Sequence, residues 1–503
     1  MTQRQKSAAR LPPSRIAAES IFLHKGAGTT LQAQLSAGVV RAVLETRARP
    51  GTRLPSTRAL AAQLSISRMT VTLVYQELCA QGYIEPMPRS GFAVADSVPH
   101  RRIALPAPAT AAATDGPDWS LWLEADAPHK RLIRKPANWR DFRFPFIYGQ
   151  ADPALFDHNA WRDCARRALG SRDFIELAVD QYSRDDPMLI DFIRSNTLPR
   201  RGIHAGEGEV LLTLGAQNAL YIACALLSRP DRLSVMEEPG YPDLAELLRR
   251  TGCPMRFQPV DAAGLDPGLL PPGTRLVHVT PSHNIPTGAT MPLARRHELL
   301  RRAGEEDFLI IEDDYEFEMS YLEAPAPALK SLDAAGRVIY VGSFSKSLFP
   351  GLRIGYLVAP PAFIDKARAL RAMILRHPPG HLQRITAYFL ALGYYDAHIV
   401  RLRHALKQRR AALEAALSGS CLRIAGAAPQ GGSSLWIAAP DGVDGRALAE
   451  ALVAESVLIE PGDVFFETPP APCPYFRLGY SSIPVERIPE GIAIIERVVR
   501  DMA

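Results

Sequence analysis

Residues 342–356 constrain the fold of this chain more than any other part of its sequence. They read Gly-Ser-Phe-Ser-Lys-Ser-Leu-Phe-Pro-Gly-Leu-Arg-Ile-Gly-Tyr and directly follow an apolar run at 338–341. The apolar run predicts a buried strand, so Ser343, Ser345 and Lys346 are expected just beyond its carboxyl end. The Pro-Gly pair at 350–351 breaks the chain and can turn Arg353 back toward Lys346. A lone Ser-Lys pair usually lies on the protein surface. Here the amine of Lys346 is accompanied by the hydroxyls of Ser343 and Ser345 and the guanidinium of Arg353, which favours a functional site.

Short apolar runs alternate with helical patterns from residue 141 onward. The expected strands are 210–214, 233–236, 276–279, 308–311, 338–341 and 354–358, and helices are expected at 216–227 and 241–251. Strands that are apolar throughout and separated by helices indicate an α/β fold with a buried, mostly parallel sheet. Ligands of such sheets collect at the carboxyl ends of the strands.

Several reactive side chains follow these expected strands. The amine of Lys346, hydroxyls and Arg353 suit a Schiff-base lysine beside the phosphate of an aldehyde cofactor, pyridoxal phosphate. Asp313 follows the strand at 308–311 and is the candidate partner of the cofactor's ring nitrogen. Ala216 and Gln217 open a helix directly after a strand, where free N–H groups suit a phosphate. The other candidates are Tyr315 near the ring oxygen, Tyr241 stacked on the ring, Asn284 in the turn after the strand 276–279, and Arg477 as a clamp for a ligand carboxylate.

The charge of the chain is divided unevenly. Residues 1–102 hold 14 Lys and Arg against 5 Asp and Glu, a net charge of +9, whereas the whole chain carries +5 and the remainder therefore −4. A basic amino-terminal piece predicts a polyanionic partner, although a solvated basic face has the same composition.

The cysteines and the hydropathy pattern indicate the compartment. The six cysteines are scattered without a Cys-x-x-Cys pair, which fits a reducing cytoplasm and argues against a metal site. No apolar run approaches the roughly 18–20 residues of a membrane span, and no signal peptide is evident. The sequence predicts a cytoplasmic protein without a membrane partner.

The amino-terminal piece has the pattern of a winged helix. Helices are expected at 31–47, from 56 after the N-cap Ser56, and at about 68–81 after the N-cap Ser67. Two short strands, 83–85 and 92–94, flank a turn-rich segment at 86–91. A helix, a helix-turn-helix and a hairpin together predict a winged helix-turn-helix domain.

This piece resembles the GntR-type winged-helix domain. The motifs are Pro-Gly-Thr-Arg-Leu-Pro-Ser-Thr-Arg-Ala-Leu-Ala at 50–61, Ser-Arg-Met-Thr-Val at 67–71, Tyr-Gln-Glu-Leu at 75–78 and Gly-Tyr-Ile at 82–84. In such a domain the third helix lies in the major groove with its first turn at the bases. The expected DNA contacts are Arg58, Ser67, Arg68, Thr70 and Thr72, with Arg89, Ser90 and Gly91 at the tip of the wing.

Four segments are expected along the chain. Residues 1–19 are predicted to be a disordered extension and 20–95 the DNA-binding domain. Residues 96–140 contain an Ala/Pro/Thr-rich run that cannot build a core. This composition predicts a linker. Residues 141–503 form the large domain.

The large domain resembles the fold-type-I aminotransferases, and the whole chain is similar to the MocR/GabR-type transcriptional regulators. The resemblance implies Lys346 as the imine lysine, Asp313 at the pyridine nitrogen and Arg477 at an amino-acid carboxylate. It also implies that Tyr182 reaches the phosphate in a partner subunit, which makes the expected assembly a homodimer. Aminotransferases usually carry Asn-Pro-Thr-Gly, but here Ile285 stands in the asparagine position and Asn284 precedes it.

The sequence therefore predicts a transcription factor that binds pyridoxal phosphate and double-stranded DNA, at an operator with two half-sites. It would sense the cofactor itself or an amine or amino-acid effector. Sustained turnover is not expected. The first alternative is a working aminotransferase with a DNA-binding head, and the second is a DNA-binding and assembly protein with an inert body.

Overall fold

The computed structural model describes residues 30–44, 50–87, 91–96, 117–122 and 135–502. The chain divides into two compact units, Met1–Ala125 and Asp126–Ala503. The predicted extension at 1–19, the wing residues Arg89 and Ser90, and most of the predicted linker lie outside the described residues.

The smaller unit is a winged helix-turn-helix. Its helices are α1 (Leu31–Leu44), α2 (Thr57–Leu64) and α3 (Arg68–Ala80), followed by the antiparallel pair β1 (Ile84–Met87) and β2 (Gly91–Val94). The hydroxyl oxygen of Ser56 accepts from the Ala59 N–H, and that of Ser67 accepts from the Thr70 N–H, so both serines are N-caps as predicted. The buried face of α3 consists of Val71, Val74, Tyr75 and Leu78.

The larger unit is built on an eight-stranded, mostly parallel sheet in the order β4-β11-β10-β9-β8-β5-β6-β7. The strands are β4 (Val210–Thr213), β5 (Leu233–Glu238), β6 (Met255–Asp261), β7 (Gly264–Leu265), β8 (Thr274–Val279), β9 (Leu309–Asp313), β10 (Val338–Ser343) and β11 (Gly355–Val358). Strands β6, β5, β8, β9 and β10 are parallel neighbours. Strand β11 runs antiparallel to β10 and β4, and β7 runs antiparallel to β6.

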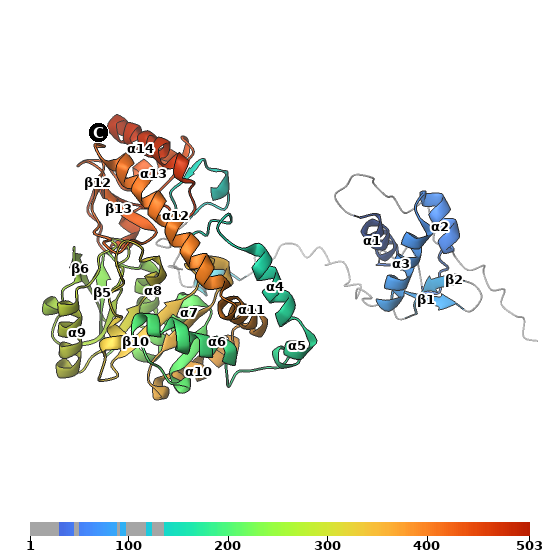
Figure 1. Cartoon of the computed structure of the whole chain (residues 1–503), viewed down its shortest axis with the longest axis horizontal. Helices are drawn as coiled ribbons and strands as arrows, with labels where there is room; N and C mark the ends of the chain where they lie inside the picture. Colours follow the sequence, from blue (N-terminus) through green and yellow to red (C-terminus); the bar gives the residue numbers. More distant parts are fainter. Residues whose placement is uncertain (1–29, 45–49, 88–90, 97–116, 123–134, 503) are drawn as a thin grey trace, which may run out of the picture. The chain divides into compact units, whose positions relative to one another are not determined.

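Helices cover both faces of this sheet (Figure 1). The helices are α4 (His158–Ala168), α5 (Ser171–Leu177), α6 (Pro187–Phe192), α7 (Gly215–Leu227), α8 (Pro242–Arg250), α9 (Leu293–Glu306), α10 (Pro361–Leu375), α11 (Gly380–Ala391) and α12 (Tyr394–Leu417). Alternate residues of β10 face opposite ways: Ile339 and Val341 pack with α7, α8 and α10, whereas Val338 packs with α9 and Tyr340 with α6, α11 and α12. Two buried faces explain why the strands are apolar at nearly every position.

The carboxyl-terminal part forms a smaller lobe, drawn in orange to red in Figure 1. Its antiparallel sheet has the order β12-β13-β16-β15, with β12 (Arg423–Ile424), β13 (Ser434–Ala438), β15 (Glu460–Pro461) and β16 (Tyr475–Gly479). Helices α13 (Gly445–Val453) and α14 (Ile488–Met502) complete it, and β14 (Val457–Leu458) pairs in parallel with β3 (Phe144–Pro145). Trp139, at the end of the predicted linker, is buried against Ile147 and Leu458.

Two further features bear on function. Among the described residues, none of the helices is long and apolar enough to cross a membrane. Within the same described ranges, no cluster of three His, Cys, Asp or Glu side chains could hold a metal ion.

Candidate functional site

A cavity of about 170 Å³ lies at the carboxyl ends of the central strands. Asp313 is the last residue of β9 and Ser343 the last residue of the neighbouring β10. Because these strands are parallel, their carboxyl ends meet at one edge of the sheet. The cavity is lined by Tyr148, Ala216, Gln217, Tyr241, Ile285, Asp313, Tyr315, Ser343, Ser345, Lys346, Pro350, Arg353 and Arg477. It thus brings together most of the residues that the sequence singled out.

The amine of Lys346 lies in an enclosed setting. Its Nζ lies 3.8 Å from the centre of the Tyr148 ring. Burial lowers the pKa of Lys346 to about 8, against an opposing effect from Glu316. Gly149 makes room for this amine, since a Cβ at that position would collide with Nζ. A buried lysine with a lowered pKa is neutral, and so nucleophilic, over more of the physiological pH range.

Asp313 offers a buried carboxylate to the same cavity. Its Oδ1 has no hydrogen-bond partner among the described residues. Burial, with a smaller contribution from Asp314, raises the pKa of Asp313 to about 7, while Lys346 opposes this rise. An unpartnered buried carboxylate oxygen is costly unless a ligand supplies a donor, and a protonated ring nitrogen is such a donor.

A second, smaller cavity of about 20 Å³ lies behind Asp313 and is lined by Glu237, His278 and Tyr241, among others. Within the described part of the chain, Glu237 Oε1 and both ring nitrogens of His278 lack hydrogen-bond partners. Burial lowers the pKa of His278 to about 3 and raises that of Glu237 to about 7. Glu237 and His278 therefore place buried polar groups in the same small cavity as Asp313.

Another part of the main cavity's lining offers groups that suit an anion. Helix α7 begins at Gly215, and its first turn presents Ala216 and Gln217 to the cavity. The single helical turn Pro350–Leu352 turns the chain, and Arg353 then adopts a left-handed conformation with φ of 54°. Its Nη2 donates to the Leu214 carbonyl at 2.9 Å. Gly215 has φ of 77°, and a Cβ on it would lie 2.9 Å from that Nη2, so the position favours glycine.

Hydroxyl groups of two serines add to these groups. Ser343 Oγ accepts from the Ser345 N–H at 3.0 Å. Ser345 Oγ is buried and, in the described structure, has no partner. It is therefore available to donate to a bound anion.

Arg477 faces the cavity from β16. Its Nε donates to Glu460 Oε2 at 2.8 Å, and its guanidinium lies 3.9 Å from the centre of the Tyr148 ring. Its Nη2 is buried without a partner among the residues described. Glu460 thus orients the guanidinium and leaves one nitrogen for a ligand carboxylate.

Two tyrosines bound the remaining walls. The Tyr241 hydroxyl lies 2.8 Å from Gln217 Oε1 and 3.1 Å from Asp243 Oδ2, and it can donate a hydrogen bond to either oxygen. Burial raises the pKa of Tyr241 and that of Tyr315 well above the usual value. Both tyrosines therefore remain protonated hydrogen-bond donors.

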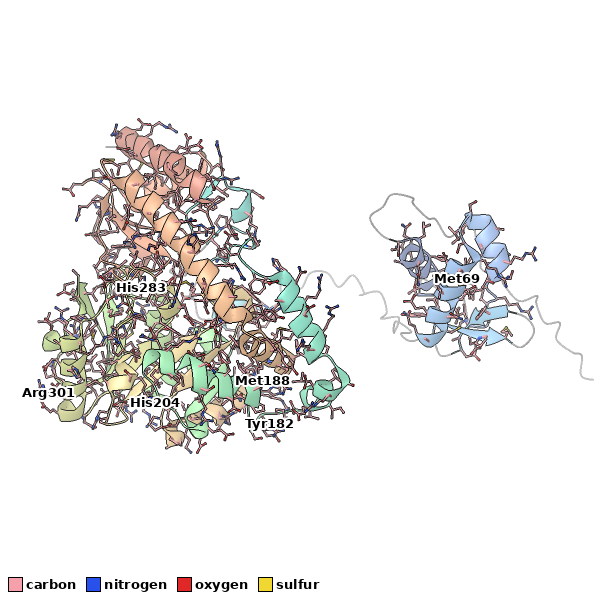
Figure 2. The ribbon with its side chains drawn as sticks, viewed as in Figure 1. Met69, Tyr182, Met188, His204, His283 and Arg301 are labelled. Carbon is pink, nitrogen blue, oxygen red and sulfur yellow. The ribbon has the colours of Figure 1, made fainter. Side chains whose placement is uncertain are left out.

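Two predicted site residues lie elsewhere. Asn284 is buried beside the cavity, where its Oδ1 accepts from the Thr287 hydroxyl at 2.7 Å, and Ile285 lines the cavity instead. Tyr182 is 53% exposed at the edge of the large unit, in a separate shallow depression beside the end of α10 (Figure 2).

Sequence reasoning missed Tyr148 and Glu460. Tyr148 enters the cavity from a segment about two hundred residues before Lys346. Its one sequence signal is the aromatic-rich segment 142–148 before Gly149. Glu460 had no local signal, because its partner Arg477 lies on the neighbouring strand β16.

Those predicted DNA contacts that the structure describes lie on α2, at the start of α3 and at the start of β2. Arg58 and Arg68 are exposed. Ser67 and Thr70 are joined at the first turn of α3, with their hydroxyl oxygens 3.1 Å apart. Thr72 Oγ1 donates to the Arg68 carbonyl at 2.9 Å, and Gly91 begins β2 with φ of 94°.

Comparison with known proteins adds to this geometry. Residues 191–495 match the family described as aminotransferase class I and II, and residues 31–94 match the bacterial regulatory proteins of the gntR family. The chain is 51% identical to the HTH-type transcriptional regulator TauR of Rhodobacter capsulatus, over 96% of this chain and 100% of that protein. It is 32% identical to the probable rhizopine catabolism regulatory protein MocR of Rhizobium meliloti, over 77% of this chain and 76% of that protein.

A solved structure shares the fold of the large unit. It is a kynurenine aminotransferase from Pyrococcus horikoshii in complex with PMP, KYN and KYA, with 25% identity and a TM-score of 0.67. The match covers 76% of this chain and 98% of that one. The large unit therefore has the fold of an aminotransferase.

Proposed function

This chain belongs to the MocR/GabR-type transcriptional regulators, in which a GntR-type winged helix is joined to a class I and II aminotransferase domain, and we propose that its cavity binds pyridoxal phosphate at Lys346. The regulator would respond to the cofactor itself or to an amine or amino acid that reaches it. The head would bind an operator with two half-sites.

The observation that carries this proposal is the match between the unpartnered groups of the cavity and the groups of the cofactor. Asp313 Oδ1 and Ser345 Oγ are buried without partners in the described structure. A protonated ring nitrogen satisfies the first, and a phosphate oxygen satisfies the second. The residues present therefore fit pyridoxal phosphate.

Each part of the cavity has a defined task in this proposal. Ala216, Gln217, Ser343, Ser345 and Arg353 would hold the phosphate, and the Asp313 carboxylate would accept a hydrogen bond from the protonated ring nitrogen. Tyr241 and Tyr315 fix the plane of the ring, and Arg477 orients a ligand carboxylate. When bound, the cofactor supplies an aldehyde that captures amines and a ring that withdraws electrons.

We further propose a homodimer, supported by the surface around Tyr182. Leu169, Phe174, Ile175 and Val179, which precede it in the chain, are more than half exposed, as is Met373 in the same depression as Tyr182. Exposed apolar side chains in such density mark an association surface. In a dimer Tyr182 would serve the phosphate end of the other subunit's cavity.

The test is spectroscopic. The purified chain is expected to be yellow with pyridoxal phosphate, and borohydride reduction is expected to fix the cofactor on Lys346. Lys346→Ala should lose the colour, whereas the exposed Lys407→Ala should keep it. Reduction on a different lysine would refute the assignment.

A second candidate function is aminotransferase activity, which is favoured by the joint presence of Lys346, Asp313 and Arg477 in one cavity. The measurement is turnover with pairs of amino acids and keto acids. Sustained conversion of both members of a pair would establish the enzyme, and at most one turnover per site fits the regulator.

A further inference from the structure

The outward face of α3 carries two exposed apolar side chains. Met69, labelled in Figure 2, is 67% exposed and Leu73 is 44% exposed. Among the large apolar side chains described between residues 30 and 96, these two are the exposed ones. The other large apolar residues of α3 are buried or half-buried.

These two residues form a short apolar strip. They are four positions apart, so they lie on the same face of the helix, about 6 Å apart along its axis. The core of the unit is completed by Val71, Val74 and Leu78 on the other face. The strip therefore has no role in the described core of this unit.

The polar groups beside the strip are partly engaged within the helix. The Thr72 hydroxyl donates to the Arg68 carbonyl, and the Ser67 hydroxyl caps the Thr70 N–H. These two hydroxyls therefore have less hydrogen-bonding capacity left for a base edge, whereas the exposed guanidinium of Arg68 keeps its own. Met69 and Leu73 add apolar contact to what this face offers.

Duplex DNA is the occupant that fits this face. The strip lies at the start of the second helix of a helix-turn-helix, the part that meets base edges in the major groove. Residues 1–102 carry a net charge of +9, which complements the surrounding phosphates. In the major groove, thymine alone among the four bases presents a methyl group.

We propose that Met69 and Leu73 pack against thymine methyl groups and thereby select thymine at two positions in each half-site. This inference rests on the proposed binding of operator DNA. A separation of about 6 Å on the helix corresponds to roughly two base-pair steps of 3.4 Å each. The two selected thymines are therefore expected about two base pairs apart, on the same strand or on opposite strands.

The contribution of each methyl can be estimated from burial. Burying one methyl-sized group stabilises a complex by a factor of about four in the dissociation constant. Removing both methyl groups should therefore weaken binding about sixteenfold if the two contacts are independent.

The test uses the full chain and a duplex selected by the wild-type protein from a pool of random sequences. Each thymine of that duplex is replaced in turn by deoxyuridine, which removes the methyl group and nothing else. The wild type should lose about fourfold in affinity at two positions of each half-site. Met69→Gln should bind the parent duplex more weakly, and its affinity should not change when deoxyuridine replaces thymine at one of these positions. Leu73→Gln should behave in the same way at the other position.

Met69→Leu is the matched control. It keeps an apolar side chain of similar volume and should retain the response to deoxyuridine. Because Met69 and Leu73 are both exposed, all three variants should unfold at the temperature of the wild type.

The possible results separate the inference from the proposed function. One result is that the wild type binds its duplex, but each deoxyuridine changes the affinity of the wild type and of Met69→Gln by the same factor. The proposed methyl contacts would then be wrong, and DNA binding would stand. Another result is that Met69→Gln and Leu73→Gln bind every duplex as tightly as the wild type and change only the oligomeric state of the protein. The strip would then contact another protein surface, and the inference would be wrong. If the wild type selects no duplex, the proposed function fails together with the inference.

Discussion

At the scale of single residues, Lys346 determines how the cavity should respond to pH. Burial lowers its pKa to about 8, below the usual value for lysine. Only the neutral amine attacks an aldehyde, so the rate of cofactor attachment should rise with pH and level off just above pH 8. Stopped-flow measurement of attachment between pH 6 and about 10.5 checks this. A rate that keeps rising toward the pKa of free lysine, about 10.4, would contradict the burial of the amine.

Gly149 and Gly393 provide a matched pair of substitutions. Both have positive φ, 71° and 80°, so alanine at either position costs roughly 1 kcal/mol of strain. A Cβ at Gly149 would collide with Lys346 Nζ, whereas a Cβ at Gly393 would meet nothing within 4 Å. Gly149→Ala should therefore greatly reduce borohydride-trapped cofactor, and Gly393→Ala should leave it unchanged. Equal trapping in both variants would show that Gly149 does not shape the site.

The small cavity behind Asp313 should hold an ordered water molecule. A site of about 20 Å³ lined by Glu237 and His278 is large enough for one water, and their unpartnered polar atoms would bind it. A high-resolution crystal structure should show this density bridging the two side chains. A dry cavity with both side chains turned to other partners would contradict the expectation.

At this scale the sequence identifies the reactive groups but not all of their neighbours. Lys346, Arg353 and Asp313 follow strands at short distances along the chain, so local patterns were sufficient to place them in one cavity. Asn284 and Ile285 show the limit, because a one-residue shift in a turn exchanges which side chain faces the cavity. Tyr148 and Glu460 are positioned by long-range packing, which a sequence pattern does not encode.

At the scale of elements, the N-caps of the helix-turn-helix give a paired prediction. The Ser67 hydroxyl accepts from the Thr70 N–H in α3, and the Ser56 hydroxyl accepts from the Ala59 N–H in α2. Loss of either cap costs about 1 kcal/mol, or roughly fivefold in local opening. Ser67→Ala should speed hydrogen exchange in the first turn of α3 only, and Ser56→Ala in that of α2 only. Uniform acceleration throughout the unit would show that the caps act on global stability instead.

Elements with strong periodicity or capping were predicted well. Helix α3 and strand β10 begin at the expected residues because Ser67 and the apolar run at 338–341 fix their starts. The first helix is described to Leu44, short of the expected residue 47, and residues 45–49 lie outside the described part. The short segments β3, β14 and β15 were not predicted, because two-residue pairings depend on tertiary contacts rather than on local pattern.

At the scale of the whole molecule, the uneven charge of the sequence anticipated a DNA-binding head and a separate body. Residues 1–102 carry +9, and the family match over residues 31–94 lies within them. Regulation requires that a ligand in the cavity of the body bind one arrangement of the molecule more tightly than another. By reciprocity, DNA must then change the affinity of the body for that ligand.

The most direct test of this account is the affinity of the full chain for its selected duplex, measured by fluorescence anisotropy with and without pyridoxal phosphate, alone and with each common amino acid. At least one of these ligands should shift the dissociation constant about fivefold or more, and Lys346→Ala should abolish the shift. Superimposable binding curves under every condition would mean that the cavity and the head are not coupled, and the regulatory account would be wrong.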